Sequence, residues 1–429
     1  MLKRIRIGDL IKQKKAHSQT GPFGTQLKAS DYVEEGVPVI NVRNIGFGDI
    51  RSNSLEFVDD DMAKELKSHV LKQDDIVFGR KGAVERHSLI SSNEEGWIQG
   101  SDCIRLRFLT KDYNPTFMSF FFRTEQHKQW MINLGSFGAT MGSLNQEIIS
   151  KIEIPDLHIN IQNQIASILS SYDELIENNK QRIKLLEEMA EEIFKEWFVR
   201  MRFPGYETAK FFNELDEEVK RGTEGALPEG WKRKRVDEFS SFKMSNAKLT
   251  KFNGTKLYLA TADISGIDIS GEGEIIDWTN KPSRAQLVPE LNSVFFARMS
   301  NTYKVLVFSK INDDLINTVA LTSGFLGLKA KNKHVLPFLF WFVKSSTFHN
   351  YKDLYSNGAT QVSLTNEGFH MIKLVEPEEL IIEKFGEISL PILDEILLLN
   401  KKNQLLQQTR DLLLPRLISG KLSVEHLLT

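Results

Sequence analysis

The sequence has little of what marks secreted or membrane proteins. Its one cysteine, Cys103, cannot form a disulfide within the chain, which indicates a reducing compartment. No run of 18 apolar residues occurs, which argues against a transmembrane helix. The basic start Met1–Arg6 is not followed by the apolar segment of a secretion signal. We therefore expect a cytoplasmic protein with no membrane partner.

Signatures of catalysis are also missing. There is no G-x-x-x-x-G-K-[ST] loop for ATP, and no Asn-Pro-Pro or Asp-Pro-Pro followed by an aromatic residue, as an amino-methyltransferase would have. No His-Glu-x-x-His or paired Cys-x-x-Cys metal site is present. We expect no catalytic residue, no metal site and no cofactor in this chain.

Charge is nearly balanced overall but unevenly distributed. The formal net charge is −2. Residues 1–156 contain 21 basic and 21 acidic residues, whereas residues 231–376 contain 19 basic and 13 acidic ones. A protein that binds DNA alone is usually more basic, because phosphate contacts supply most of the affinity. Either DNA is not the ligand, or partner subunits supply part of the contacts.

An internal repeat with a period near 220 residues is the most informative feature. Gly138–Leu144 (GATMGSL) recurs as Gly358–Leu364 (GATQVSL), and Arg80 at the end of an apolar run matches Arg298. Downstream matches follow in the same order: Asp173 with Asp394, Asn179 with Asn400, and Leu185 with Leu406. The offset stays between 218 and 221 residues, so the chain is predicted to contain two similar units.

Each unit is predicted to be a strand-rich domain followed by a long helix. Short β-branched and aromatic runs alternate with turn residues, as in Val37–Val42, Asp75–Phe78, Ile104–Phe108, Val294–Phe296 and Lys304–Phe308. Amphipathic helices are expected at Asn114–His127 and Leu336–Phe348. The fold class is therefore α+β.

Apolar residues at three- and four-residue steps follow Ile165–Trp197 and Ile381–Leu417. This is the pattern of a coiled-coil seam, and a seam of ~55 Å is longer than a domain of this size. Pro391 predicts a kink or a late helix start. Asn179 and Asn400 lie on or beside the seam, where a buried asparagine fixes register. The apolar helix ends, Phe194, Trp197 and Phe198 with Leu412–Ile418, pack in a core or dock a partner.

The sequence resembles the specificity subunits of type I restriction-modification systems. The resemblance rests on Gly21-Pro22-Phe23-Gly24-Thr25-Gln26-Leu27-Lys28, on the repeated Gly-Ala-Thr and Ser-Leu signature, on Gln162–Leu169, and on Leu227-Pro228-Glu229-Gly230-Trp231. Together these motifs extend over nearly the whole chain. The second half departs from the pattern, because Phe242–Ala247 stands where a second Gly-Pro-Phe-Gly loop is expected.

The resemblance implies two target-recognition domains at opposite ends of a pair of long antiparallel coiled-coil helices, with an internal pseudo-two-fold repeat. Each domain would read one half of an asymmetric, bipartite site in double-stranded DNA. Two methyltransferase subunits and the restriction and translocation subunits would be the partners. S-adenosylmethionine, ATP and Mg are expected on those partners. The implied divisions are recognition domain 1–157, helix 158–202, linker 203–230, recognition domain 231–376 and helix 377–429.

Side chains that can form paired hydrogen bonds with base edges are the candidates for DNA contact. Those on predicted loops are Gln26, Lys28, Arg43, Asn44, Arg80, Lys81, Arg86 and His87 in the first unit, and Lys243, Asn246, Lys248, Arg298, Asn301 and Gln361 in the second. A solvated surface charge or a plain turn is the competing interpretation of each. Two other functions stay open: a coiled-coil scaffold with two protein-binding domains, and a site-specific endonuclease that acts alone.

Overall fold

The computed structural model describes residues 3–135, 142–358 and 362–422. The chain forms two compact units, Met1–Ile176 with Leu405–Thr429, and Glu177–Gln404. Both long helices run through a unit boundary. Across the described ranges, no helix has the continuous apolar length that crossing a bilayer requires.

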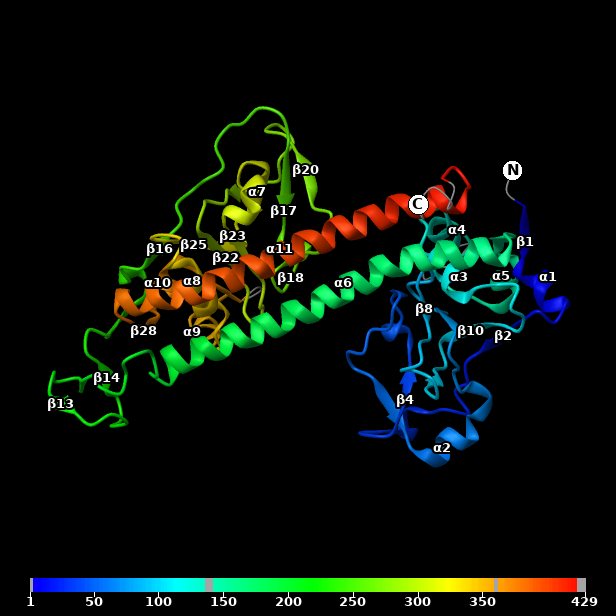
Figure 1. Ribbon diagram of the computed structural model, residues 1–429, viewed down its shortest axis with the longest axis horizontal. Helices are drawn as coiled ribbons and strands as arrows, with labels where there is room; N and C mark the ends of the chain where they lie inside the picture. Colours follow the sequence, from blue (N-terminus) through cyan, green and yellow to red (C-terminus); the bar gives the residue numbers. More distant parts are fainter. Residues whose placement is uncertain (1–2, 136–141, 359–361, 423–429) are drawn as a thin grey trace. The chain divides into compact units, whose positions relative to one another are not determined.

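The first unit contains mixed sheets and short helices (Figure 1). A five-stranded sheet has the order β2 (Ala16–Thr20), β10 (Cys103–Phe108), β7 (Ile76–Gly79), β8 (His87–Leu89) and β5 (Phe47–Gly48). A four-stranded sheet has the order β3 (Tyr32–Val33), β6 (Glu56–Val58), β4 (Val37–Ile40) and β9 (Ile98–Gln99). The remaining elements are the strand pair β1 (Arg4–Arg6) and β11 (Glu153–Pro155) and the helices α1 (Ile7–Lys12), α2 (Asp60–Glu65), α3 (Pro115–Phe122), α4 (Glu125–Gly135) and α5 (Gln146–Lys151).

The second unit repeats the centre of both sheets but has different edge strands. Its first sheet has the order β16 (Phe242–Met244), β25 (Phe325–Ala330), β22 (Ser293–Ala297) and β23 (Val305–Phe308), and its second has the order β20 (Glu274–Ile276), β17 (Lys256–Leu259), β24 (Val319–Thr322) and β21 (Ala285–Leu287). The other elements are β15 (Lys232–Arg235) paired with β28 (Lys373–Glu376), β18 (Ile264–Ser265) with β19 (Asp268–Ile269), β26 (Ser356–Asn357) with β27 (Ser363–Leu364), and the helices α7 (Asp313–Thr318), α8 (Leu336–Lys344), α9 (Ser346–Leu354) and α10 (Asn366–Met371).

Backbone contacts confirm the register of the sequence repeat. The N–H of Leu144 donates to the carbonyl of Arg80, and the N–H of Leu364 donates to the carbonyl of Arg298. The second sheet of each unit contains a parallel strand pair, β4 with β9 and β17 with β24. The first unit has a further parallel pair, β5 with β8. The α+β fold and its duplication are therefore as the sequence predicts.

Each expected amphipathic helix is in fact two helices. In the first unit α3 ends at Phe122 and α4 begins at Glu125, and in the second α8 ends at Lys344 and α9 begins at Ser346. A hydroxyl residue stands at each break. Ser345 Oγ accepts the N–H of Phe348, and Thr124 Oγ1 accepts the N–H of His127 at 3.4 Å. These side chains cap a new helix start, which the apolar spacing alone does not indicate.

The long helices are α6 (Ile159–Phe194), extended by a π-helical turn at Lys195–Val199, and α11 (Glu379–Ile418). The expected late start of the second helix is wrong, because α11 begins twelve residues before Pro391 and continues through it. In the second unit Asn179 bonds to Asn403, and Arg182 lies 2.9 Å from Glu395. The order of these pairs shows that the two helices are antiparallel there.

Most apolar side chains at the helix ends lie in the cores of the two units, as the simpler interpretation predicts, but Leu412 is 65% exposed. Phe194 and Trp197 are buried among aromatic rings of the second unit, including Phe338 and Phe385. Leu414 and Leu417 are buried in the core of the first unit.

The segment 203–230 differs from the structureless connector that its sequence suggests. It contains a three-stranded sheet of β12 (Phe211–Phe212), β13 (Glu218–Val219) and β14 (Leu227–Pro228). Phe211 is buried, and Phe203 stacks on Trp231 with ring centroids 5.4 Å apart. Strands of two residues are too short to show alternation, so the pattern is invisible in the sequence. The division of the chain into five segments that the resemblance implies remains a prediction.

Candidate DNA interface

In the first unit, loops that carry candidate residues meet at the ends of neighbouring strands. They follow β2, β4 and β7, and the turn 100–102 joins β9 to β10. Backbone hydrogen bonds connect them: the N–H of Gly21 donates to Cys103, that of Gly100 to Ile40, and that of Arg80 to Asp102. The topology thus gathers segments from residues 21–86 into one loop cluster.

The close approach of two loops requires glycine at position 21. A Cβ at Gly21 would lie 1.9 Å from the carbonyl oxygen of Gly100. By contrast, a Cβ at Gly24 would meet no atom within 4 Å. Gly21 therefore sets how the segment Phe23–Lys28 sits beside the turn at Gly100, whereas Gly24 is free of this constraint.

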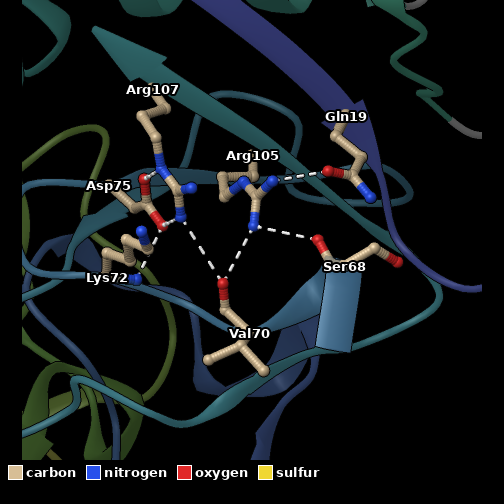
Figure 2. Close-up of polar contacts among 7 residues, drawn as sticks. All are labelled: Gln19, Ser68, Val70, Lys72, Asp75, Arg105 and Arg107. Carbon is tan, nitrogen blue, oxygen red and sulfur yellow. Dashed lines mark hydrogen bonds and ion pairs between the residues drawn. The ribbon is translucent and has the colours of Figure 1, made fainter. Parts of the chain in front are cut away.

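A buried polar cluster fixes the strands behind these loops (Figure 2). Asp75 has a fully buried side chain and accepts both Nε and Nη2 of Arg107 at 2.5 Å, and the N–H of Lys72 at 2.8 Å. Arg105, two residues earlier on the same face of β10, donates to the Val70 carbonyl at 3.0 Å and to Gln19. The cluster ties β2 and β10 to the start of β7.

The second unit keeps this ion pair with other residues. Lys329 occupies the β25 position that matches Arg107, and its Nζ lies 2.7 Å from Glu290. Ser245 also donates to Glu290. Glu290 carries the same charge as Asp75 but stands three residues before Ser293, the position that matches Asp75, so comparison of the two sequences alone does not reveal the equivalence.

Several first-unit candidates have exposed or half-exposed side chains. Gln26 and Lys28 are exposed on the loop after β2, Arg43 lies 2.7 Å from Glu56, and Lys81 lies 3.0 Å from Asp102. Exposed ion pairs of this kind contribute about 0–1 kcal/mol, so a phosphate can replace the carboxylate at little cost. Arg80 and Arg86 are half-buried, and the guanidinium of Arg86 lies 5.6 Å from the Phe47 ring centroid.

Two first-unit candidates are corrected, because their side chains are fully buried. Asn44 accepts the N–H of Asn41 and donates to the carbonyls of Arg51 and Asn53, so its amide closes a turn. His87 lies in the core with Nε2 at 3.0 Å from Ser119 Oγ. Burial holds the pKa of His87 well below its ordinary value, so the ring is neutral. Neither side chain presents a group to DNA in this structure.

In the second unit Lys243 lies on β16, and the other candidates within the described residues follow β16 and β22. Lys243, Asn246, Lys248 and Asn301 are exposed. Arg298 instead holds protein atoms: Nε donates to Phe325 O at 3.0 Å, Nη1 to Leu364 O at 3.0 Å, and Nη2 to Asn366 Oδ1 at 2.8 Å. Arg298 therefore positions its loop, although Arg80 occupies the matching place in the first unit. Gln361 lies outside the described residues, as do Gly138–Met141, Ala359 and Thr360 of the repeated signature.

Sequence reasoning missed a lysine that supports the loop after β22. Lys352 on α9 is fully buried, and its Nζ donates to the carbonyls of Met299 and Thr302 at 3.0 and 2.8 Å. Burial lowers the pKa of this ammonium. The sequence signal that could have identified Lys352 is a lysine on the apolar face of a helix. Arg284, exposed beside the turn at Gly324, was also missed, since it lies far from the loop motifs in the sequence.

Comparisons with known proteins agree with this architecture. Residues 5–188 match the model of the type I restriction modification DNA specificity domain. The type I restriction enzyme MjaIX specificity subunit of Methanocaldococcus jannaschii is 25% identical over 318 residues, which cover 72% of this chain and 70% of that protein. The HindI specificity subunit of Haemophilus influenzae is 20% identical over 435 residues, which cover 89% and 94%.

One solved structure shows the same fold. The crystal structure of the type I restriction-modification S subunit from M. genitalium superposes with a TM-score of 0.55 at 15% identity, covering 97% of this chain and 96% of that one. The relatives' names agree with a role in sequence recognition rather than catalysis. Residues 5–188 therefore belong to the family of type I restriction modification DNA specificity domains, and the chain is similar over most of its length to specificity subunits of type I restriction-modification systems.

Proposed function

We propose that the chain reads an asymmetric, bipartite target in double-stranded DNA, one half-site per repeat. The observation that carries the proposal is the duplicated domain with a different loop cluster in each copy. The first cluster presents Gln26 and Lys28 beside a Gly-Pro-Phe-Gly loop, and the second presents Asn246 and Lys248 after β16. Different donors and acceptors select different bases, so the two half-sites should differ.

The proposed contacts combine base reading with phosphate binding. Lys28, Lys81, Lys243 and Lys248 are exposed cations suited to phosphate, whereas Gln26 and Asn246 have the paired donor and acceptor that recognise adenine. The second domain, with 19 basic and 13 acidic residues over 231–376, should bind phosphate more strongly than the balanced first domain.

We further propose that the long helices dock two methyltransferase subunits, which direct modification to the site. Supporting this, α6 exposes apolar side chains away from the cores: Leu175 is 48% exposed, Leu185 65% and Met189 48%. Such residues in water favour a partner. Restriction and translocation subunits would join that assembly, and S-adenosylmethionine, ATP and Mg would be bound by the partners.

Co-expression with the methyltransferase encoded nearby, followed by sequencing of genomic DNA with detection of modified bases, tests the proposal. We expect a split, asymmetric methylated motif that disappears when this gene is deleted. Gln26→Ala with Lys28→Ala should relax one half of the motif, and Asn246→Ala with Lys248→Ala the other half. A palindromic motif would refute the asymmetric reading. A stable complex without any motif favours the scaffold, and metal-dependent cutting by this chain alone favours the endonuclease.

A further inference from the structure

A hollow of about 510 Å³ in the first unit lies apart from the loop cluster. It is bounded by β1, α4, the end of α5 and β11, and Arg4, Arg6, Lys151 and Trp130 line it. The DNA candidates of this unit lie on the loops after β2, β4 and β7, and none of them lines the hollow. This volume is within the range of small-molecule sites.

The hollow is positively charged at its rim. Arg4 and Arg6 are two residues apart on β1, so both point to the same face, while Ile5 between them packs on the core. Arg6 lies 3.2 Å from Glu153, and Lys151 lies 2.6 Å from Glu147, both as exposed pairs. Arg4 makes no ion pair with any residue that the structure describes. Because exposed ion pairs contribute little free energy, the side chains of Arg4, Arg6 and Lys151 can each reorient to bind an anion.

Aromatic rings form the wall of the hollow. The rings of His127 and Trp130 are stacked, with centroids 6.0 Å apart and planes at 23°, and the centroids of Phe121 and His127 are 5.4 Å apart. His127 is 6% exposed, and its Nε2 has no hydrogen-bond partner within residues 3–135, 142–358 and 362–422. Burial lowers the pKa of His127 to about 3, so the wall carries no charge of its own.

A second hollow of about 560 Å³ shares Arg4, Phe121 and Gln126 with the first. Its lining adds three more cations, Arg123, Lys128 and Arg410, and two carboxylates, Glu125 and Asp411. The two hollows therefore adjoin at Arg4, and a ligand longer than one could extend from the first into the second.

We infer that this hollow binds a nucleotide, with the phosphate on Arg4 and Arg6 and the base against Trp130. Arginine binds phosphate oxygens through two parallel N–H donors, and a flat aromatic wall stacks any base. Two kinds of ligand contain a base joined to a phosphate: a free mononucleotide, and one nucleotide within a single strand. The inference goes beyond the reading of duplex DNA and involves none of the residues proposed for it.

Calorimetric titration of the full chain with adenosine and cytidine monophosphates tests the inference. We expect saturable binding that Arg4→Ala weakens at least 10-fold, while Lys12→Ala, which removes an exposed cation on α1 outside the hollow, leaves it unchanged. Trp130→Leu should bring the nucleotide's affinity down to that of inorganic phosphate. Trp130 is half-buried, so Trp130→Phe serves as the variant if the leucine variant does not fold. It should retain binding but lose the quenching of tryptophan fluorescence that a base stacked on Trp130 should cause in the wild-type chain.

Ligand length separates these two kinds of ligand. A single-stranded tetranucleotide that binds more than 10-fold tighter than the monophosphates, and that loses this advantage with Lys128→Ala, identifies a strand in both hollows. Equal affinity identifies a free mononucleotide. Absence of saturable binding by the wild-type chain, or equal affinity of the wild type and Arg4→Ala, overturns the inference. Loop variants that abolish duplex recognition but leave nucleotide binding intact keep this result separate from the proposed function.

Discussion

Replacing Gly21 with alanine should damage one half of DNA recognition through a single steric clash. The added Cβ would lie 1.9 Å from the Gly100 oxygen, whereas unstrained carbon–oxygen contacts are about 3.3 Å, so the segments must separate by about 1.4 Å. The hydrogen bond from Gly21 N–H to Cys103 O, 2.9 Å long, would then break. Overpacking typically costs about 1–3 kcal/mol and a lost hydrogen bond about 1 kcal/mol.

The same displacement would move Gln26 and Lys28 out of hydrogen-bond range of their targets. A paired base contact is worth about 1–3 kcal/mol, so affinity for the corresponding half-site should fall roughly 10- to 100-fold. Competition binding with duplexes altered in one half-site at a time measures this loss, and thermal unfolding measures the cost in stability. Gly24→Ala is the matched control and should change neither. Equal affinity of Gly21→Ala and wild type for both half-sites would refute the reasoning, as would equal damage from Gly24→Ala.

Three further variants test other parts of the structure. Arg298→Ala should lower the free energy of unfolding by about 2–4 kcal/mol, because three charge-assisted hydrogen bonds are lost. Arg80→Ala should weaken DNA binding with little change in melting temperature. A lower melting temperature for Arg80→Ala would mean that Arg80, too, holds its loop in place. The double variant Asn179→Leu, Asn403→Leu replaces the 2.8 Å amide pair of buried Asn179 and half-buried Asn403 with apolar contact. It should stabilise the chain by about 1–2 kcal/mol in urea unfolding; no change would mean that the pair is hydrated. His127 is neutral when folded, with its pKa lowered to about 3, and gains a proton on unfolding below about pH 6.5, so stability is full above that pH and falls as the pH drops. His127→Phe should therefore reduce the stability lost between pH 7 and pH 5 by about 2 kcal/mol, and an unchanged pH profile would contradict the assignment.

The duplicated fold could be predicted from sequence because periodic features carry it. The match of Arg80 to Arg298 gave the correct register, and the three- and four-residue spacing located both long helices. Such patterns can be detected in the sequence alone, since each repeat and each helical turn recurs at a fixed interval. From the sequence, Asn179 was expected either on the helix seam or beside it. In the structure Asn179 is buried and bonds to Asn403.

Roles of individual polar residues could not be predicted, because burial depends on what folds over them. Asn44 and His87 have the composition of DNA-reading side chains, yet neighbouring segments cover both completely. The sequence places Lys352 among apolar positions of a helix, but only the fold shows that α9 brings it beneath the loop at Met299. Propensity describes a residue's own backbone, whereas these roles depend on partners distant in the chain.

The sequence by itself determined the resemblance to specificity subunits, the α+β class, the repeat and the two long helices, because each depends on local motifs or on regular spacing. Only the tertiary structure decided which arginine of the repeated pair is held by protein atoms, and which loops meet at Gly21 and Gly100. It also revealed the basic hollow at Arg4. The physical reason is that hydrogen bonds, steric contact and desolvation act over a few ångströms in space, between residues as far apart in the sequence as Asn179 and Asn403, which are 224 positions apart.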